Sequence, residues 1–123
     1  MKITTIKQSN IEIAVVSSSE IILNDVQSAL DFMATVQYET GSRYIILNKS
    51  AICEELFNLK TKLAGEILQK FANYHVKIAI VGDFSAYTSK NLKDFIYESN
   101  NGNDVFFLAN ETQAVEKFAA MKN

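Results

Sequence analysis

The sequence has 123 residues, of which 48% are hydrophobic and 21% charged, a composition typical of one globular domain. Its 12 Lys and Arg against 14 Asp and Glu give a net charge of −2. This charge argues against a general nucleic-acid-binding surface, which needs an excess of positive side chains. No apolar run approaches the roughly 18 residues of a membrane-spanning helix. We therefore expect residues 1–123 to form a single domain whose partners include neither nucleic acid nor membrane.

The first ten residues, "MKITTIKQSN", alternate apolar and polar side chains and lack the continuous apolar stretch of a signal peptide. The single cysteine, Cys53, cannot form a disulfide within the chain, which suits a reducing compartment. Both features predict a cytoplasmic protein.

Residues 2–8 and 11–16 are rich in β-branched side chains and predict two strands joined by a tight turn at "SN". A helix is then expected from Asn24, with Gln27 at the spacing of a capping box. Gly41 follows the apolar stripe of that helix, where a left-handed C-cap residue is expected.

Three short apolar runs, residues 43–48, 76–81 and 104–109, have the length of buried strands, and a helical pattern follows each. The helical patterns cover residues 61–74, residues 89–101 and the segment that begins at Asn110, with Gln113 at capping-box spacing; residues 50–59 predict a short helical turn. This alternation predicts an α/β domain with a mostly parallel central sheet of about five strands, an N-terminal hairpin and helices packed against it.

Parallel strands end at one edge of a sheet, where ligands of open α/β sheets bind. Four segments are expected at this carboxyl rim: residues 17–20, 48–50 and 82–89, and Asn110. They are rich in hydroxyls and amides and carry Glu20, Lys49 and Asp83 as charges. The helix N-termini point to the same edge and favour anions.

The loop after the strand at 76–81, "GDFSAYTSK", is the main candidate binding segment. Its predicted binding residues are Asp83, Phe84, Ser85, Tyr87, Thr88, Ser89 and Lys90. Asp83 can accept from loop N–H groups, bind a cation or serve as a base, and Thr88 or Ser89 can cap the next helix. Phe84 and Tyr87 indicate a contact surface if they are exposed and lids of the core if they are buried.

A second candidate is Lys60, Thr61 and Lys62, where a hydroxyl lies between two cations near a helix start. Such a group can hold an anion or be phosphorylated. In the alternative interpretation, Thr61 is only an N-cap and the lysines are solvated.

No catalytic residue, metal site or cofactor is assigned from the sequence. His75 is the only histidine and nothing places it beside a nucleophile, while Cys53 lies in an apolar segment. Glu54 and Glu55 are adjacent and would not face each other on a helix. No Gly-rich nucleotide motif occurs.

The segment "LAGEILQKFANYHVKIAIVGDFSAYTSKNLKDFIYESN" closely resembles the bacterial family catalogued as domain of unknown function 4180. The resemblance covers most of the chain, including "ALDFMATVQYE" and "DVFFLA". It implies membership of that family but no established activity.

The order of elements more distantly resembles the STAS domain, the fold of bacterial anti-sigma-factor antagonists. In that family a kinase phosphorylates a serine of an Asp-Ser-Ser-Gly-like motif and so controls partner binding. The comparison places Lys60, Thr61 and Lys62 at the Asp-Ser-Ser positions, so Lys60 replaces the acid and Lys62 the usual phosphoserine.

The sequence supports three hypotheses about function. The first is a STAS-like module that binds a protein partner or a small anionic ligand at the carboxyl rim. The second is a small enzyme that uses Asp83 with rim hydroxyls. The third is a structural role through self-association, such as a homodimer, with Phe84, Tyr87 or Tyr97 in the interface.

Overall fold

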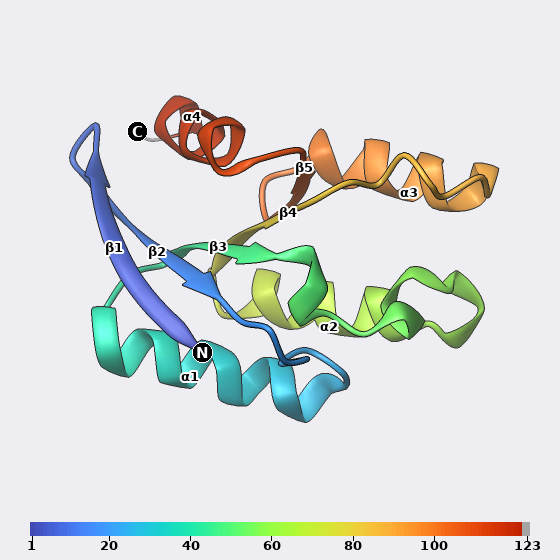
Figure 1. Cartoon of the computed structure of the whole chain (residues 1–123), viewed down its shortest axis with the longest axis horizontal. Coiled ribbons are helices and arrows are strands. Elements are labelled where there is room, and N and C mark those ends of the chain that lie inside the picture. The colour runs from blue at the N-terminus through green and yellow to red at the C-terminus, as the bar shows by residue number, and fades with distance from the viewer. Residues whose placement is uncertain (122–123) are drawn as a thin grey trace.

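Figure 1 shows the computed structural model of the protein, which describes residues 1–121. The strands are β1 (Lys2–Gln8), β2 (Ile11–Ser17), β3 (Tyr44–Asn48), β4 (Lys77–Val81) and β5 (Val105–Leu108). The helices are α1 (Val26–Thr40), α2 (Leu63–Asn73), α3 (Lys90–Asn100) and α4 (Glu111–Met121). Three 3₁₀ turns, η1 (Lys49–Ala51), η2 (Glu54–Phe57) and η3 (Leu59–Thr61), connect β3 to α2.

The strands form one five-stranded sheet in the order β1-β2-β3-β4-β5. β1 pairs antiparallel with β2, and the remaining neighbours are parallel, with Ile45 opposite Ile78 and Ile80 opposite Phe107. The α/β class, the mostly parallel sheet and the N-terminal hairpin predicted from the sequence are confirmed. The four helices also follow the predicted order.

The hairpin turn follows directly from its two residues. Ser9 and Asn10 have φ of 52° and 67°, and they join Gln8 to its cross-strand partner Ile11. Two successive left-handed residues twist in the same sense as the strands they connect, and asparagine tolerates this conformation better than most residues. The predicted tight turn at "SN" is therefore confirmed.

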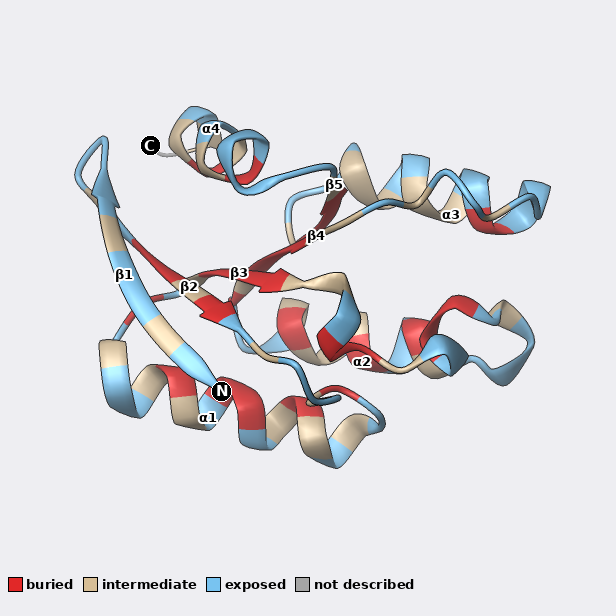
Figure 2. Ribbon diagram, viewed as in Figure 1, coloured by how far each residue is buried: buried red, intermediate tan, exposed pale blue. Residues whose placement is uncertain are grey.

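The two faces of the sheet are covered unequally. Side chains of one face, such as Ile45, Leu47 and Phe107, pack in a large core with residues of α1, α2 and α3. On the other face, Ile46 and Phe106 pack mainly against α4. In Figure 1, α1 and α2 lie on one side of the sheet and α4 on the opposite side, and α3 flanks β5. Figure 2 shows buried residues in β2 to β5 and in the helices that pack against them, whereas β1 is mostly exposed.

The cap of α1 differs from the prediction. The Asp25 carboxylate accepts from the Ser28 N–H at 2.7 Å, and the Ser28 hydroxyl accepts from the Asp25 N–H at 3.0 Å. Asn24 and Gln27 were therefore the wrong pair, because Asp25, one residue later, is the N-cap and the helix begins at Val26. At the other end of α1, the expected left-handed residue is confirmed, since Gly41 has φ of 71°.

The connection between β3 and α2 is less regular than predicted. The short helical turn expected over residues 50–59 is divided between 3₁₀ turns, with Leu56 and Phe57 buried. Thr61 is not the N-cap of α2, because Lys62 occupies that position with φ of 63°. The chain therefore changes direction through consecutive 3₁₀ turns before α2 begins, and Leu56 and Phe57 pack in the larger core.

Within the part of the chain that the structure describes, no helix has both the length and the apolar character needed to cross a bilayer.

Candidate functional site

The carboxyl rim is formed where β3 and β4 end side by side. Asn48 lies opposite Val81 in the parallel register, so Lys49 and Gly82 follow at the same level. A Cβ atom added to Gly82 would lie 2.6 Å from Cβ of Lys49, far inside the contact distance of two carbon atoms. Glycine at position 82 therefore makes room for the Lys49 side chain.

The ammonium group of Lys49 lies among aromatic rings. Its Nζ is 4.9 Å from the ring centroid of Tyr87, 5.7 Å from that of Phe57 and 5.8 Å from that of Phe84. Oε1 of Glu54 lies 3.9 Å from the same nitrogen. Each ring face attracts a cation through its quadrupole, and the carboxylate adds a charge interaction. We call these five residues the Lys49 cluster.

Tyr87 contacts both an aromatic member and the acidic member of the Lys49 cluster. Its ring stacks on Phe57 with centroids 5.1 Å apart, and its hydroxyl donates to the Glu54 carboxylate at 3.1–3.2 Å. Burial raises the pKa of Tyr87 by disfavouring the phenolate, and the neighbouring Glu54 raises it further, while Lys49 acts in the opposite direction. The phenol is therefore neutral at physiological pH and can donate this hydrogen bond.

Phe84 and Tyr87 are both half-buried, an outcome between the two that the sequence left open. The Phe84 ring lies 5.9 Å from that of Phe57 and 5.6 Å from that of Phe107 in the core. Each aromatic side chain thus covers the end of the core and also exposes part of its surface at the carboxyl rim.

Asp83 is exposed, and its carboxylate accepts from the Ser85 N–H at 2.9 Å. Hydrogen bonds from the hydroxyl and the N–H of Ser85 lower the pKa of Asp83 below its ordinary value, with a smaller contribution from the Lys49 charge. Asp83 is consequently a carboxylate at neutral pH that shapes its own loop and faces solvent.

The end of the loop serves the start of α3. Ser89 is the N-cap, and its hydroxyl accepts from the N–H of Leu92 at 3.3 Å. Lys90 pairs with Asp94 at 2.7 Å, four residues on, while Thr88 is exposed. Of the two expected capping residues, the structure selects Ser89, which leaves the Thr88 side chain at the surface.

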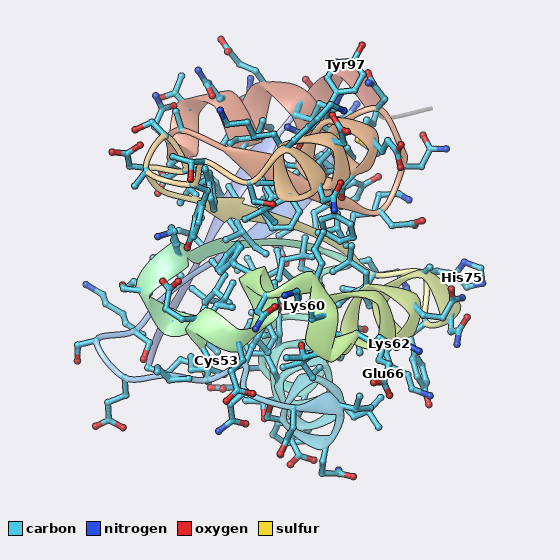
Figure 3. All side chains as sticks on the ribbon, turned by 90° about the vertical axis from the view of Figure 1, so that its right-hand side faces the viewer. Cys53, Lys60, Lys62, Glu66, His75 and Tyr97 are labelled. Atoms are coloured by element: carbon cyan, nitrogen blue, oxygen red, sulfur yellow. The ribbon has the colours of Figure 1, made fainter. Side chains whose placement is uncertain are left out.

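Lys60, Thr61 and Lys62 lie at the exposed end of η3. The Thr61 hydroxyl lies 2.9 Å from the carbonyl oxygen of Asn58 and accepts from the Leu63 N–H at 3.3 Å, so it stabilises the turn. Figure 3 shows Lys60 and Lys62 on the surface of this segment. Among the described contacts, none joins these three residues to the loop at 83–90.

Three shallow hollows follow one another along the carboxyl rim. The central one, of about 550 Å³, lies around Asn48, Lys49, Glu54, Gly82 and Asp83. A second, of about 450 Å³, shares Asn48 and extends to residues 17–19 and Lys2. A third, of about 360 Å³, shares Gly82 and Asp83 and reaches residues 107–109 at the end of β5. We call the three together the rim trough.

The groups best suited to nucleophilic or metal chemistry lie apart. Cys53 follows β3 at the carboxyl end of the sheet, whereas His75 precedes β4 at the opposite end, and Figure 3 shows them well separated. Over residues 1–121, no group of three His, Cys, Asp or Glu side chains is placed to hold a metal ion.

Two members of the Lys49 cluster were not predicted as site residues. Glu54 was interpreted only as one of two adjacent acids, and Phe57 was not singled out within the short helical turn predicted over residues 50–59. Lys49 was expected at the carboxyl rim as a charge. The sequence indicates this cluster only weakly, because the cluster forms only when η2 and the loop at 83–89 come together in the fold. The sequence offers only the position of Lys49 directly after a buried strand.

No curated protein and no solved structure is detectably similar to the chain. A family model matches residues 8–118, which include every strand except part of β1 and all of the Lys49 cluster. The protein therefore belongs to the family described as Domain of unknown function (DUF4180).

Proposed function

We propose that this protein is a binding module that holds an extended segment of a protein partner in the rim trough. The observation that carries the proposal is the continuity of the three hollows, which adjoin through Asn48 and through Gly82 and Asp83. A compact small molecule would need one deep cavity, whereas a shallow row of hollows suits a chain that lies across several strand ends.

The charges along the rim trough give the partner segment a direction. Lys2 lines the hollow beside β1, Lys49 and Glu54 line the centre, and Asp83 lies at the junction with the hollow beside β5. The trough is therefore positive toward β1 and negative toward β5. A segment with an acidic side chain near Lys49 and a basic one near Asp83 would match this order.

The Lys49 cluster prepares the central hollow for such a partner. The Lys49 stem is held against Gly82, and the ammonium is only partly solvated, with 26% of the side chain exposed. A cation that is already partly desolvated and held in place loses less hydration and less rotamer freedom on pairing with an incoming carboxylate. A small anionic ligand would use the same cation, but it would leave the flanking hollows empty.

The enzymatic alternative receives less support from the geometry. A general acid or base acts best when its pKa lies near the operating pH, whereas the Ser85 hydrogen bonds lower that of Asp83. We infer that Asp83 contributes a fixed negative charge for recognition.

The setting of this function is part of the proposal. We infer a bacterial cytoplasm from the family resemblance and from the single thiol of Cys53. A STAS-like relation and a phosphorylation of Thr61 remain predictions. The hydrogen bonds of the Thr61 hydroxyl would have to break before a phosphate could be added there.

Site-specific photo-crosslinking tests the proposal directly. A benzophenone amino acid replaces Ile21, which is 55% exposed and lines the central hollow, in cells that make the protein naturally. The matched control carries the same group at Tyr38, which is 92% exposed in the last turns of α1. We expect a discrete protein adduct from position 21 and none from position 38, with the cross-linked partner peptide identified by mass spectrometry.

The purified partner then supplies the quantitative test. Ile21→Asp and Lys49→Ala should each raise the Kd by about tenfold or more, whereas Tyr38→Asp should leave it unchanged. Equal cross-linking from positions 21 and 38, or a Kd that neither rim substitution alters, would contradict the proposal.

A further inference from the structure

A separate pocket lies at the opposite end of the sheet from the carboxyl rim, between α1 and the end of α2. Its volume is about 360 Å³. Met33 of α1 and Val76, just before β4, line it and are 5% and 2% exposed, and the half-buried Leu30 completes its apolar surface. This volume is near the lower end of the range for small-ligand pockets, about 300–1,000 Å³.

Part of the pocket wall is exposed to solvent. Ala34, Arg43 and Tyr74 line it and are exposed, whereas Met33 and Val76 are buried. The pocket therefore combines buried apolar residues with exposed ones, including the charged Arg43, and a ligand can enter it from solvent.

One positive charge stands at this pocket. Arg43 is exposed and lines it, and Nη1 of its guanidinium donates to the Tyr74 carbonyl oxygen at 2.9 Å. That bond orients the guanidinium and uses one of its five N–H donors. Among the described residues Arg43 makes no ion pair, and no acidic side chain is among those lining the pocket.

We propose that this pocket binds a small amphipathic carboxylate, with its apolar chain or ring against Leu30, Met33 and Val76 and its carboxylate paired with Arg43. A guanidinium can bind a carboxylate through two parallel hydrogen bonds, which an ammonium or a neutral donor cannot reproduce. The Tyr74 side chain, 56% exposed, also lines the pocket and extends its apolar wall. This site is independent of the rim trough and of the function proposed for it.

Calorimetric titration with two matched probes tests the charge pairing. Octanoate, below its micellar concentration, and 1-octanol share the apolar chain and differ in the carboxylate. We expect wild type to bind octanoate more tightly than octanol, and Arg43→Gln to weaken octanoate binding by about tenfold while octanol binding stays the same. Lys7→Gln removes a positive charge from exposed β1 and should change neither affinity.

A second pair of variants tests the location. Ala34→Leu places a larger side chain on the pocket lining and should weaken both probes, whereas Ala120→Leu makes the same change at an exposed position of α4 outside the pocket and should weaken neither. Methyl NMR spectra of wild type should show octanoate-induced shifts at Leu30, Met33 and Val76, a result that needs no variant to fold. Shifts confined to other methyl groups, equal binding of octanoate and octanol to wild type, or octanoate binding unchanged by Arg43→Gln would overturn the proposal.

Discussion

The close approach of Gly82 and Lys49 predicts that Gly82→Ala destabilises the protein when Lys49 is present and stabilises it when Lys49 is replaced by glycine. Gly82 does not have positive φ, so alanine is allowed by the backbone at this position. Its new Cβ would nevertheless lie 2.6 Å from Cβ and 3.1 Å from Cδ of Lys49. Ordinary carbon contacts are about 3.5–4.0 Å, so the two segments must separate by roughly 1 Å.

The loss of stability depends on which atom of Lys49 the new Cβ would contact. Cβ of Lys49 is attached directly to the backbone of η1, so a change of side-chain rotamer cannot move it away. Overpacking of this kind costs about 1–3 kcal/mol. Displacement of the Lys49 ammonium from the aromatic rings adds about 0.5–1 kcal/mol, because this is a partly solvated cation–π contact. We expect Gly82→Ala to lower the free energy of unfolding by about 2–3 kcal/mol.

The same substitution should be harmless once Lys49 has no side chain. In a Lys49→Gly background, Gly82→Ala removes no contact and restricts the unfolded chain, which should raise the free energy of unfolding by about 0.4–1 kcal/mol. Urea unfolding of the four proteins, followed by far-ultraviolet circular dichroism, measures both effects at constant m-value. A loss of stability of equal size in both backgrounds would refute the reasoning, because the cost would then arise from the backbone of residue 82.

Three further predictions concern the loops and caps. Gly41→Ala should lower the free energy of unfolding by about 1 kcal/mol because this C-cap residue has φ of 71°. Gly65 is exposed in α2 with open space around it, so Gly65→Ala should raise the free energy of unfolding by about 0.5–1 kcal/mol; urea midpoints distinguish the two variants. Burial raises the pKa of Tyr87, so the stability contributed by the neutral phenol should be complete below a pH of about 10 and disappear as the pH rises through the pKa of folded Tyr87. In thermal melts, a Tyr87→Phe variant should lose less stability than wild type at alkaline pH. The pKa of Asp83, measured by carboxyl NMR, should lie below that of a free aspartate and return toward it in Ser85→Ala; an unchanged pKa would contradict the hydrogen-bond explanation. The stabilising effect of the Asp83 carboxylate should be present at neutral pH and disappear as acid protonates it.

Local sequence patterns were sufficient where the deciding interactions are local. The β-branched runs, the "SN" turn and Gly41 each act within a few residues, so the positions of the strands along the chain, the hairpin and the end of α1 could be predicted. Ser89 was one of two expected caps for α3 because the hydroxyl of an N-cap contacts a backbone N–H only three residues away. The choice of Asn24 failed because Asn24 and the adjacent Asp25 are both favourable N-cap residues, and the local pattern does not decide between them.

The candidate site depends on contacts between distant segments. Lys49 follows β3, Phe57 and Glu54 come from η2, and Tyr87 lies beyond β4, so their positions depend on how the chain folds back over the end of the sheet. The pocket at Arg43 likewise forms only because α1 and the end of α2 meet beside β4.

The sequence by itself determined the α/β class and the order of helices and strands along the chain, because hydrophobic periodicity and turn chemistry act over a few residues. The order of the strands within the sheet comes from the tertiary structure. Only the tertiary structure decided that Phe84 and Tyr87 are half-buried and that Lys49 lies among three rings beside a carboxylate. The physical reason is that desolvation, ring packing and charge pairing depend on distances between side chains from different segments, which no local pattern in a single sequence specifies.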